Sequence, residues 1–137
     1  MRVGKNAKLT ALANVPLFAR CSKGELAHIA QLADEVDLAP GKTLTKEGAR
    51  GREFFVLFEG TAEVTREGQR LATMRGGDFF GEISLVTDVP QTATVTTTSD
   101  VYALVITDRA FRQLLRESPT IQGKVLEAIA SRLAHSL

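Results

Sequence analysis

The sequence has a single cysteine, Cys21, and no run of about 18 or more apolar residues, the length that a membrane-spanning helix needs. One cysteine excludes an intramolecular disulfide and fits a reducing compartment, although a cysteine-poor secreted protein would have the same count. The basic residues Arg2, Lys5 and Lys8 are not followed by an apolar stretch of signal-peptide length. We therefore expect a cytoplasmic protein with no membrane association.

The sequence also has little net charge. Its 17 lysines and arginines against 16 aspartates and glutamates leave a formal net charge of +1, and the basic residues are scattered. No basic patch therefore predicts nucleic-acid binding. The chain has 137 residues, 44% of them hydrophobic, and no repeat, low-complexity segment or linker. It fits a single domain with its own core, spanning residues 1–137.

The middle of the chain, from Val36 to Ile106, has the pattern of β-structure. Short β-type runs alternate there with glycine-containing turns. Phe54–Phe58 is a continuous apolar run, typical of a strand buried on both faces, whereas Thr61–Arg66 and Thr92–Thr98 alternate apolar and polar residues. Strands at a regular spacing of about 8 to 12 residues predict a sandwich, roll or barrel.

Both ends of the chain have helical patterns. Ser22-Lys23-Gly24-Glu25 has the form of a capping box, so we expect a helix to begin near Lys23. Thr107 or Asp108 can cap a second helix, and Ser118-Pro119 suits the start of the last one. The last helix has an apolar stripe that must pack on the β-structure, on a partner chain or over a ligand: Ile121, Val125, Ile129 and Leu133. The expected fold is mainly β with α, an antiparallel, jelly-roll-like β-roll flanked by N-terminal and C-terminal helices.

A glycine-rich segment between two predicted strands, Gly76–Val86, has residues suited to ligand binding. Gly81–Leu85 can form one helical turn, whose N-terminal amides suit an anion such as a phosphate. Glu82 can accept a hydrogen bond from a hydroxyl such as that of ribose, and Thr92, at the start of the next predicted strand, adds a hydroxyl donor. These residues indicate a site for a phosphorylated, hydroxyl-bearing ligand. The alternative is that the glycines are ordinary turn residues and that Glu82 caps its own turn or pairs with an arginine.

Within this segment, Phe80-Gly81-Glu82-Ile83-Ser84-Leu85 is followed, four residues later, by Pro90-Gln91-Thr92-Ala93-Thr94-Val95. This pattern resembles the phosphate-binding cassette of cyclic nucleotide-binding domains, a family that includes the regulatory subunits of protein kinase A, the catabolite activator protein and cyclic nucleotide-gated channels. The resemblance covers nearly the whole chain and implies a ligand-sensing β-roll that binds cAMP or cGMP and requires no cofactor. It also implies that Glu82 binds the ribose 2′-hydroxyl. The backbone amides near Gly81, Ile83 and Ser84, with the Thr92 hydroxyl, would hold the cyclic phosphate.

Gln91 departs from the family pattern, which has an arginine there as the positive partner of the phosphate. A charge-assisted hydrogen bond contributes about 1.5–3 kcal/mol, against about 0.5–1.5 kcal/mol for a neutral one. An amide would therefore weaken phosphate binding roughly tenfold or more. Gln91 itself is either a ligand contact or a plain loop residue, and two interpretations of the pocket follow. The pocket either binds a cyclic nucleotide weakly, helped by a cation such as Arg75 or Arg52, or is vestigial or suited to a less negative ligand. Arg50 and Arg52 otherwise read as solvated residues of a glycine-flanked loop.

These observations leave three hypotheses of function. The first is a regulatory module in which a cyclic nucleotide repositions the C-terminal helices and so biases an output protein. The second is a ligand-free scaffold that forms a homodimer or binds an output protein through its last helix, and Gln91 favours it. The third is a metal-dependent enzyme of the cupin type, which shares the β-roll but needs several metal ligands clustered on strands.

The two histidines, His28 and His135, both fall in predicted helices, which argues against the cupin hypothesis. No Ser-His-Asp or Cys-His arrangement has a spacing that suggests catalysis either. We therefore expect that the protein is not an enzyme and binds no metal. DNA binding is also not expected, because no helix-turn-helix follows the last helix before Leu137.

Overall fold

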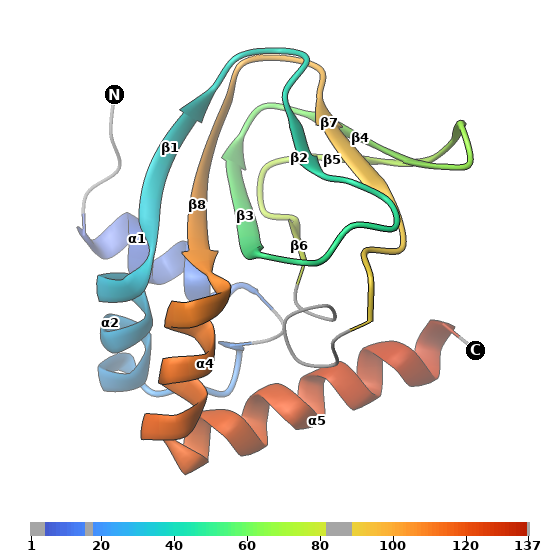
Figure 1. Cartoon of the computed structure of the whole chain (residues 1–137). Coiled ribbons are helices and arrows are strands. Elements are labelled where there is room, and N and C mark those ends of the chain that lie inside the picture. Colours follow the sequence, from blue (N-terminus) through green and yellow to red (C-terminus); the bar gives the residue numbers. More distant parts are fainter. Residues whose placement is uncertain (1–4, 16–17, 82–88, 137) are drawn as a thin grey trace. The chain divides into compact units, whose positions relative to one another are not determined.

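The computed structural model describes residues 5–15, 18–81 and 89–136. The chain divides into two compact units, which Figure 1 shows as ribbons. One unit is helical and consists of the residues up to Leu32 and those from Arg109 onward, and the other, Ala33–Asp108, is the β-unit. The single domain over residues 1–137 stays a prediction.

The described part of the β-unit contains eight strands in two four-stranded sheets. The strands are β1 (Asp34–Leu38), β2 (Thr43–Thr45), β3 (Glu53–Glu59), β4 (Ala62–Arg66), β5 (Gln69–Met74), β6 (Phe79–Phe80), β7 (Thr94–Thr97) and β8 (Val101–Thr107). One sheet has the order β1-β8-β3-β6 and the other β2-β7-β4-β5, and every pairing is antiparallel. The predicted antiparallel β-roll with flanking helices is confirmed.

Apolar side chains from both sheets form the core of the β-roll. In β3 the side chains from Phe54 to Leu57 are each no more than 4% exposed, as expected for a continuous apolar run. In β4 only Ala62 and Val64 are buried, which is the predicted alternation. The main cluster comprises Phe55, Leu57, Ala62, Val64, Phe80, Val95, Val101, Ala103 and Val105.

The helical unit contains, among the described residues, α1 (Lys5–Ala13), α2 (Lys23–Leu32), α4 (Asp108–Glu117) and α5 (Pro119–Ser136). The predicted capping box starts α2, because Glu25 N donates to Ser22 Oγ at 3.2 Å and Ser22 N donates to Glu25 Oε1 at 2.8 Å. Ser118 caps α5, since its Oγ accepts a hydrogen bond from Ile121 N at 3.2 Å. Both helix starts agree with the sequence.

Polar contacts join the helices of this unit to one another. Lys124 Nζ on α5 lies 2.9 Å from Glu25 Oε1 on α2, and His28 Nε2 lies 3.7 Å from Glu117 Oε2 on α4. Three residues of the predicted apolar stripe on α5 are buried: Ile121, Val125 and Ile129. The side chain of the fourth, Leu133, is not among those that the structure describes. No helix in the described part of the chain combines the length and the hydropathy that a membrane crossing requires.

The contact between Glu25 and Lys124 predicts a dependence of stability on pH. The hydrogen bond from Lys124 and the amide of Ser22 lower the pKa of Glu25 below its ordinary value of 4.5. The unfolded chain therefore takes up this proton at a higher pH than the folded chain, so the contribution of Glu25 to stability is present above pH 4.5 and is lost as the pH falls through the lowered pKa. We expect Lys124→Met to lower the free energy of unfolding at pH 7 and to reduce its further decrease between pH 7 and pH 3–4. Urea unfolding at pH 7 and at pH 3–4 measures both. If the free energy of unfolding of the variant decreases with acid as much as that of the unaltered chain, the Glu25–Lys124 contact is not the cause of this decrease.

Candidate functional site

The structure describes both ends of the predicted cassette. Glu82, Ile83 and Ser84 lie outside the described residues, whereas Gly81, Gln91 and Thr92 lie within them. Gly81 directly precedes the undescribed stretch 82–88 and Gln91 follows shortly after it, so the contacts of these two residues show how each described end of the cassette is attached to the β-unit.

The first end of the cassette is attached to β3. Strand β6 pairs with β3, with Phe80 opposite Phe55, and the two rings stack with centroids 5.0 Å apart. Gly81 follows directly and has φ +102°, a conformation that side chains disfavour. A Cβ atom on Gly81 would lie 2.5 Å from the carbonyl oxygen of Glu53. Glycine is therefore required here so that the backbone can pass close to the start of β3.

The second end of the cassette is attached to the β2–β3 connection, residues 46–52. Gly48 N donates to the carbonyl oxygen of Gln91 at 2.8 Å, and Gln91 N donates to the carbonyl oxygen of Ala49 at 2.8 Å. This reciprocal pair of hydrogen bonds holds the backbone of Gln91 against the connection. Gln91 is thus a constrained position, and a ligand contact of its side chain stays a prediction.

Thr92 does not begin the next strand, contrary to the sequence-based expectation. Strand β7 begins at Thr94, because the backbone of Gln91 pairs with the β2–β3 connection rather than with a strand. The carbonyl oxygen of the exposed Thr92 accepts a hydrogen bond from Arg66 Nε at 2.8 Å, and Glu47 N donates to Thr94 Oγ1 at 3.0 Å. The segment that follows Gln91 is therefore held by the β4–β5 hairpin on one side and by the β2–β3 connection on the other.

A cavity of about 230 Å³ lies beside Gln91. Its other lining residues come from β2, the β2–β3 connection and the first residue of β3: Thr43, Leu44, Thr45, Lys46, Ala49, Arg50, Arg52 and Glu53. We call this space the Gln91 cavity. The lining has three cations and one carboxylate, Glu53, and therefore a formal charge of +2. This charge suits an anion.

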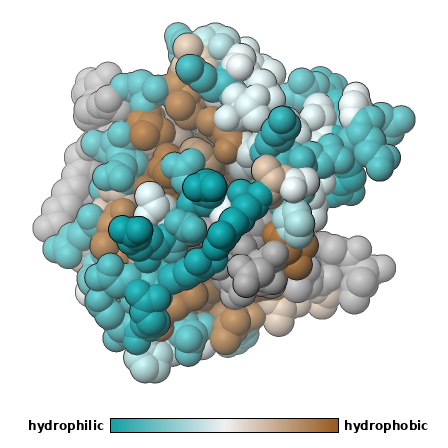
Figure 2. Space-filling model, in the orientation of Figure 1, coloured by the Kyte–Doolittle hydropathy of each residue, from teal (hydrophilic) through white to brown (hydrophobic). Residues whose placement is uncertain are grey.

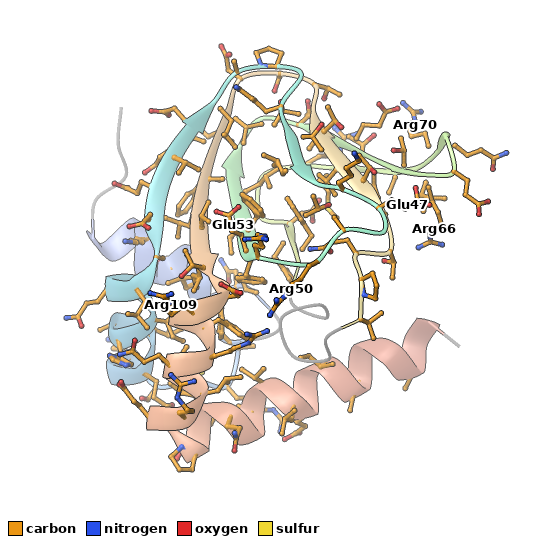
Figure 3. All side chains as sticks on the ribbon, viewed as in Figure 1. Glu47, Arg50, Glu53, Arg66, Arg70 and Arg109 are labelled. Carbon is orange, nitrogen blue, oxygen red and sulfur yellow. The ribbon has the colours of Figure 1, made fainter. Side chains whose placement is uncertain are left out.

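Charged side chains lie beside the apolar Leu44 and Ala49 in the lining of the Gln91 cavity. Figure 3 labels Arg50 and Glu53 near the start of β3, and Figure 2 shows a hydrophilic band across that part of the face. Of the two cations expected to assist phosphate binding, Arg52 lines the cavity and Arg75 does not. Sequence reasoning missed Lys46 and Arg50 as neighbours of Gln91, because no local pattern pairs Gln91 with a loop so much earlier in the chain.

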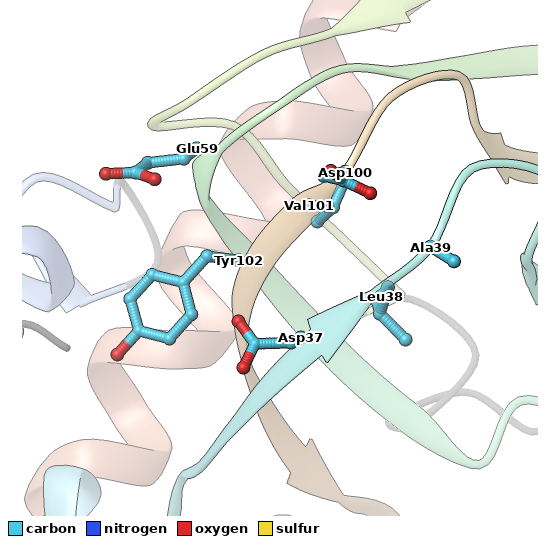
Figure 4. Close-up of a pocket in the computed structure, with 7 residues that line it drawn as sticks. All are labelled: Asp37, Leu38, Ala39, Glu59, Asp100, Val101 and Tyr102. Carbon is cyan, nitrogen blue, oxygen red and sulfur yellow. The ribbon is translucent and has the colours of Figure 1, made fainter. Parts of the chain in front are cut away.

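A second cavity, of about 390 Å³, lies at the end of β1 and the start of β8 (Figure 4). It is lined by Asp37, Leu38, Ala39, Glu59, Asp100, Val101 and Tyr102. The three carboxylates would repel a phosphate, and neither described end of the cassette contributes to the lining. The larger volume therefore does not make this cavity the better site for a nucleotide.

Comparison with known proteins agrees with the fold. Residues 35–118, more than half of the chain, match the sequence model of the cyclic nucleotide-binding domain. The chain belongs to the cyclic nucleotide-binding domain family. The matched residues include both described ends of the cassette, Gly81 and Gln91, as well as the lining of the Gln91 cavity.

Two relatives illustrate the range of proteins in which this family occurs. The chain is 38% identical over 113 residues to a cAMP-dependent protein kinase regulatory subunit of Mycosarcoma maydis, a match that covers 76% of this chain and 22% of the relative. It is 29% identical over 130 residues to a putative potassium channel protein of Rhodopseudomonas palustris, covering 92% of this chain and 31% of that one. The chain thus spans less than a third of these curated relatives, which are named for regulation or transport rather than catalysis.

Solved structures give the same fold. The N-terminal domain of a transcriptional regulator from Streptomyces coelicolor A3(2) superimposes with a TM-score of 0.80 at 31% identity, covering 92% of this chain and 94% of that one. The regulatory domain of Toxoplasma gondii protein kinase A, crystallised with cAMP, has a TM-score of 0.79 at 20% identity, covering 95% and 49%. This second likeness concerns the fold alone.

Proposed function

We propose that the chain is a regulatory module that binds a cyclic nucleotide, cAMP or cGMP, through Gly81, Glu82, Ile83, Ser84, Gln91 and Thr92. The family match over residues 35–118 carries this proposal, because it contains the whole predicted cassette. The cAMP-dependent regulatory subunits among its relatives, and the Toxoplasma domain crystallised with cAMP, make cAMP the first ligand to test. The roles of Glu82, Ile83 and Ser84 are carried over from the family pattern.

Binding is proposed to be weak, because Gln91 provides an amide where the family pattern has a guanidinium group. The ligand would regulate by binding more tightly to one arrangement of the C-terminal helices than to another, since only a difference in affinity can shift that equilibrium. The output would be carried by a partner protein or by a further part of a longer protein in the cytoplasm. In this proposal the module itself catalyses no reaction and requires no metal or cofactor.

Isothermal titration calorimetry of the purified chain with cAMP and with cGMP tests the proposal. We expect one of the two to bind, and we expect Glu82→Ala to weaken that binding roughly tenfold to a hundredfold, because a hydrogen bond to a charged acceptor is lost. Glu63→Ala, on β4 and outside the cassette, is the control that changes the same charge and should leave the affinity unchanged. Absence of binding by the unaltered chain would contradict the proposal.

A second candidate function is a ligand-free scaffold that forms a homodimer or binds an output protein through α5. Two observations favour it: the absence of the family arginine at position 91, and Leu126 on α5, which is 50% exposed. Light scattering distinguishes the candidates. The scaffold hypothesis predicts a dimer that forms with and without nucleotide and that Leu126→Lys abolishes. The sensor hypothesis predicts no particular oligomeric state.

A further inference from the structure

The two described ends of the cassette meet one short stretch of chain, Ala49–Glu53. At one end, Gln91 N donates to the carbonyl oxygen of Ala49. At the other, Gly81 passes so close to the carbonyl oxygen of Glu53 that a Cβ atom would lie 2.5 Å from it. The residues between these two contacts therefore lie next to both described ends of the cassette.

Two arginines, Arg50 and Arg52, occupy this stretch, and both line the Gln91 cavity. Backbone contacts position them, since Asp108 N donates to the carbonyl oxygen of Arg52 at 2.7 Å and Gly51 between them is buried. Both side chains are exposed, and among the described residues no ion pair or side-chain hydrogen bond holds either guanidinium group. Their donors are therefore available to an anionic ligand.

We propose that Arg50 and Arg52, on the β2–β3 connection, replace the missing arginine at position 91 as the positive partners of the ligand's phosphate. This inference rests on the proposed function, because it names the charge partner in the same cyclic nucleotide site. A guanidinium group pairs well with a phosphate from any direction in which its fork can reach two oxygens, so the charge need not come from the cassette itself. Lys46, in the same cavity, adds to the positive field, and Glu53 offsets part of it.

An excess of positive charge in the Gln91 cavity also explains why an amide is tolerated at position 91. An arginine at position 91 would add a further cation to a lining that already carries a formal +2. A cyclic phosphate has one negative charge and two free oxygens, so a third guanidinium group would compete with the first two for the same acceptors and part of the gain in phosphate binding would be lost. The effect of Gln91→Arg is therefore coupled to the charges at positions 50 and 52.

The test compares cAMP with adenosine, which has the base and the ribose but no phosphate, by isothermal titration calorimetry. We expect the double variant Arg50→Gln/Arg52→Gln to bind cAMP roughly tenfold more weakly than the unaltered chain and to bind adenosine equally well. Arg70→Gln, an exposed arginine on β5 outside the cavity, is the matched charge control and should change neither affinity. Thermal unfolding of each variant verifies that the fold is intact.

A double-mutant cycle adds a measurement that would not change if Arg50 and Arg52 had only a structural role. Gln91→Arg should raise the affinity for cAMP about tenfold in the Arg50→Gln/Arg52→Gln background and by less in the unaltered chain. An equal loss of cAMP and adenosine affinity in the double variant, or no loss, would overturn this inference while leaving the proposed function intact. If the unaltered chain binds only cGMP, the same comparison is made with cGMP and guanosine, and binding of neither cyclic nucleotide would overturn both.

Discussion

The Gly81→Ala variant is expected to unfold with a free energy about 2–6 kcal/mol lower than that of the unaltered chain. Part of this loss is backbone strain, because a non-glycine residue at φ +102° costs about 1–3 kcal/mol. The rest is overpacking of about 1–3 kcal/mol, since the new Cβ would lie 2.5 Å from a backbone oxygen of Glu53 that cannot easily move. Urea unfolding followed by circular dichroism measures the change.

Gly77→Ala is the matched control for this prediction. Gly77 has φ +97°, almost the same backbone conformation as Gly81, but no atom lies within 4 Å of the position of an added Cβ. It should therefore cost only the strain, about 1–3 kcal/mol. Equal losses in the two variants would mean that the close approach of Gly81 to β3 contributes nothing, and that the first end of the cassette is held in another way.

Phe55→Ala is expected to lower the free energy of unfolding by about 3–5 kcal/mol, the usual cost of removing a buried phenyl ring and leaving a cavity. Phe55 is 4% exposed, belongs to the main core cluster and stacks on Phe80, the residue before Gly81. The variant should therefore also weaken the support of the first end of the cassette. With total stabilities of about 5–15 kcal/mol for ordinary domains, such a loss moves the urea midpoint strongly.

The exposed Leu71 provides the comparison for Phe55. Leu71 on β5 is 50% exposed, so Leu71→Ala should change the free energy of unfolding by no more than about 0.5 kcal/mol. A loss below about 1 kcal/mol in Phe55→Ala would contradict the assignment of Phe55 to a closely packed core.

Features that depend on neighbouring residues could be predicted from the sequence. The apolar run Phe54–Phe58 became the buried strand β3, because a strand covered on both faces cannot tolerate polar side chains. The capping box at Ser22 became the start of α2, because its two hydrogen bonds join residues three apart. The family could be recognised for a similar reason, since the cassette motif is a continuous stretch of sequence.

The boundary at Thr92 shows where such reasoning was wrong. The alternating pattern from Thr92 to Thr98 predicted a strand over its whole length, but β7 covers only Thr94–Thr97. The backbone of Gln91 pairs with Gly48 and Ala49 instead, and the Thr92 carbonyl accepts from the Arg66 side chain. Alternation describes the side chains, whereas the extent of a strand depends on where its backbone finds partners.

The sequence by itself determined the class of fold, the starts of α2 and α5, the main strands of the core and the cassette motif with its unusual Gln91, because each of these depends on residues that lie close together in the chain. The tertiary structure alone decided the strand orders β1-β8-β3-β6 and β2-β7-β4-β5 and the meeting of Gly81 and Gln91 with Ala49–Glu53. These contacts join backbones that are far apart in sequence, and side-chain periodicity does not specify such pairings. The arginines of the β2–β3 connection became neighbours of the cassette only through them.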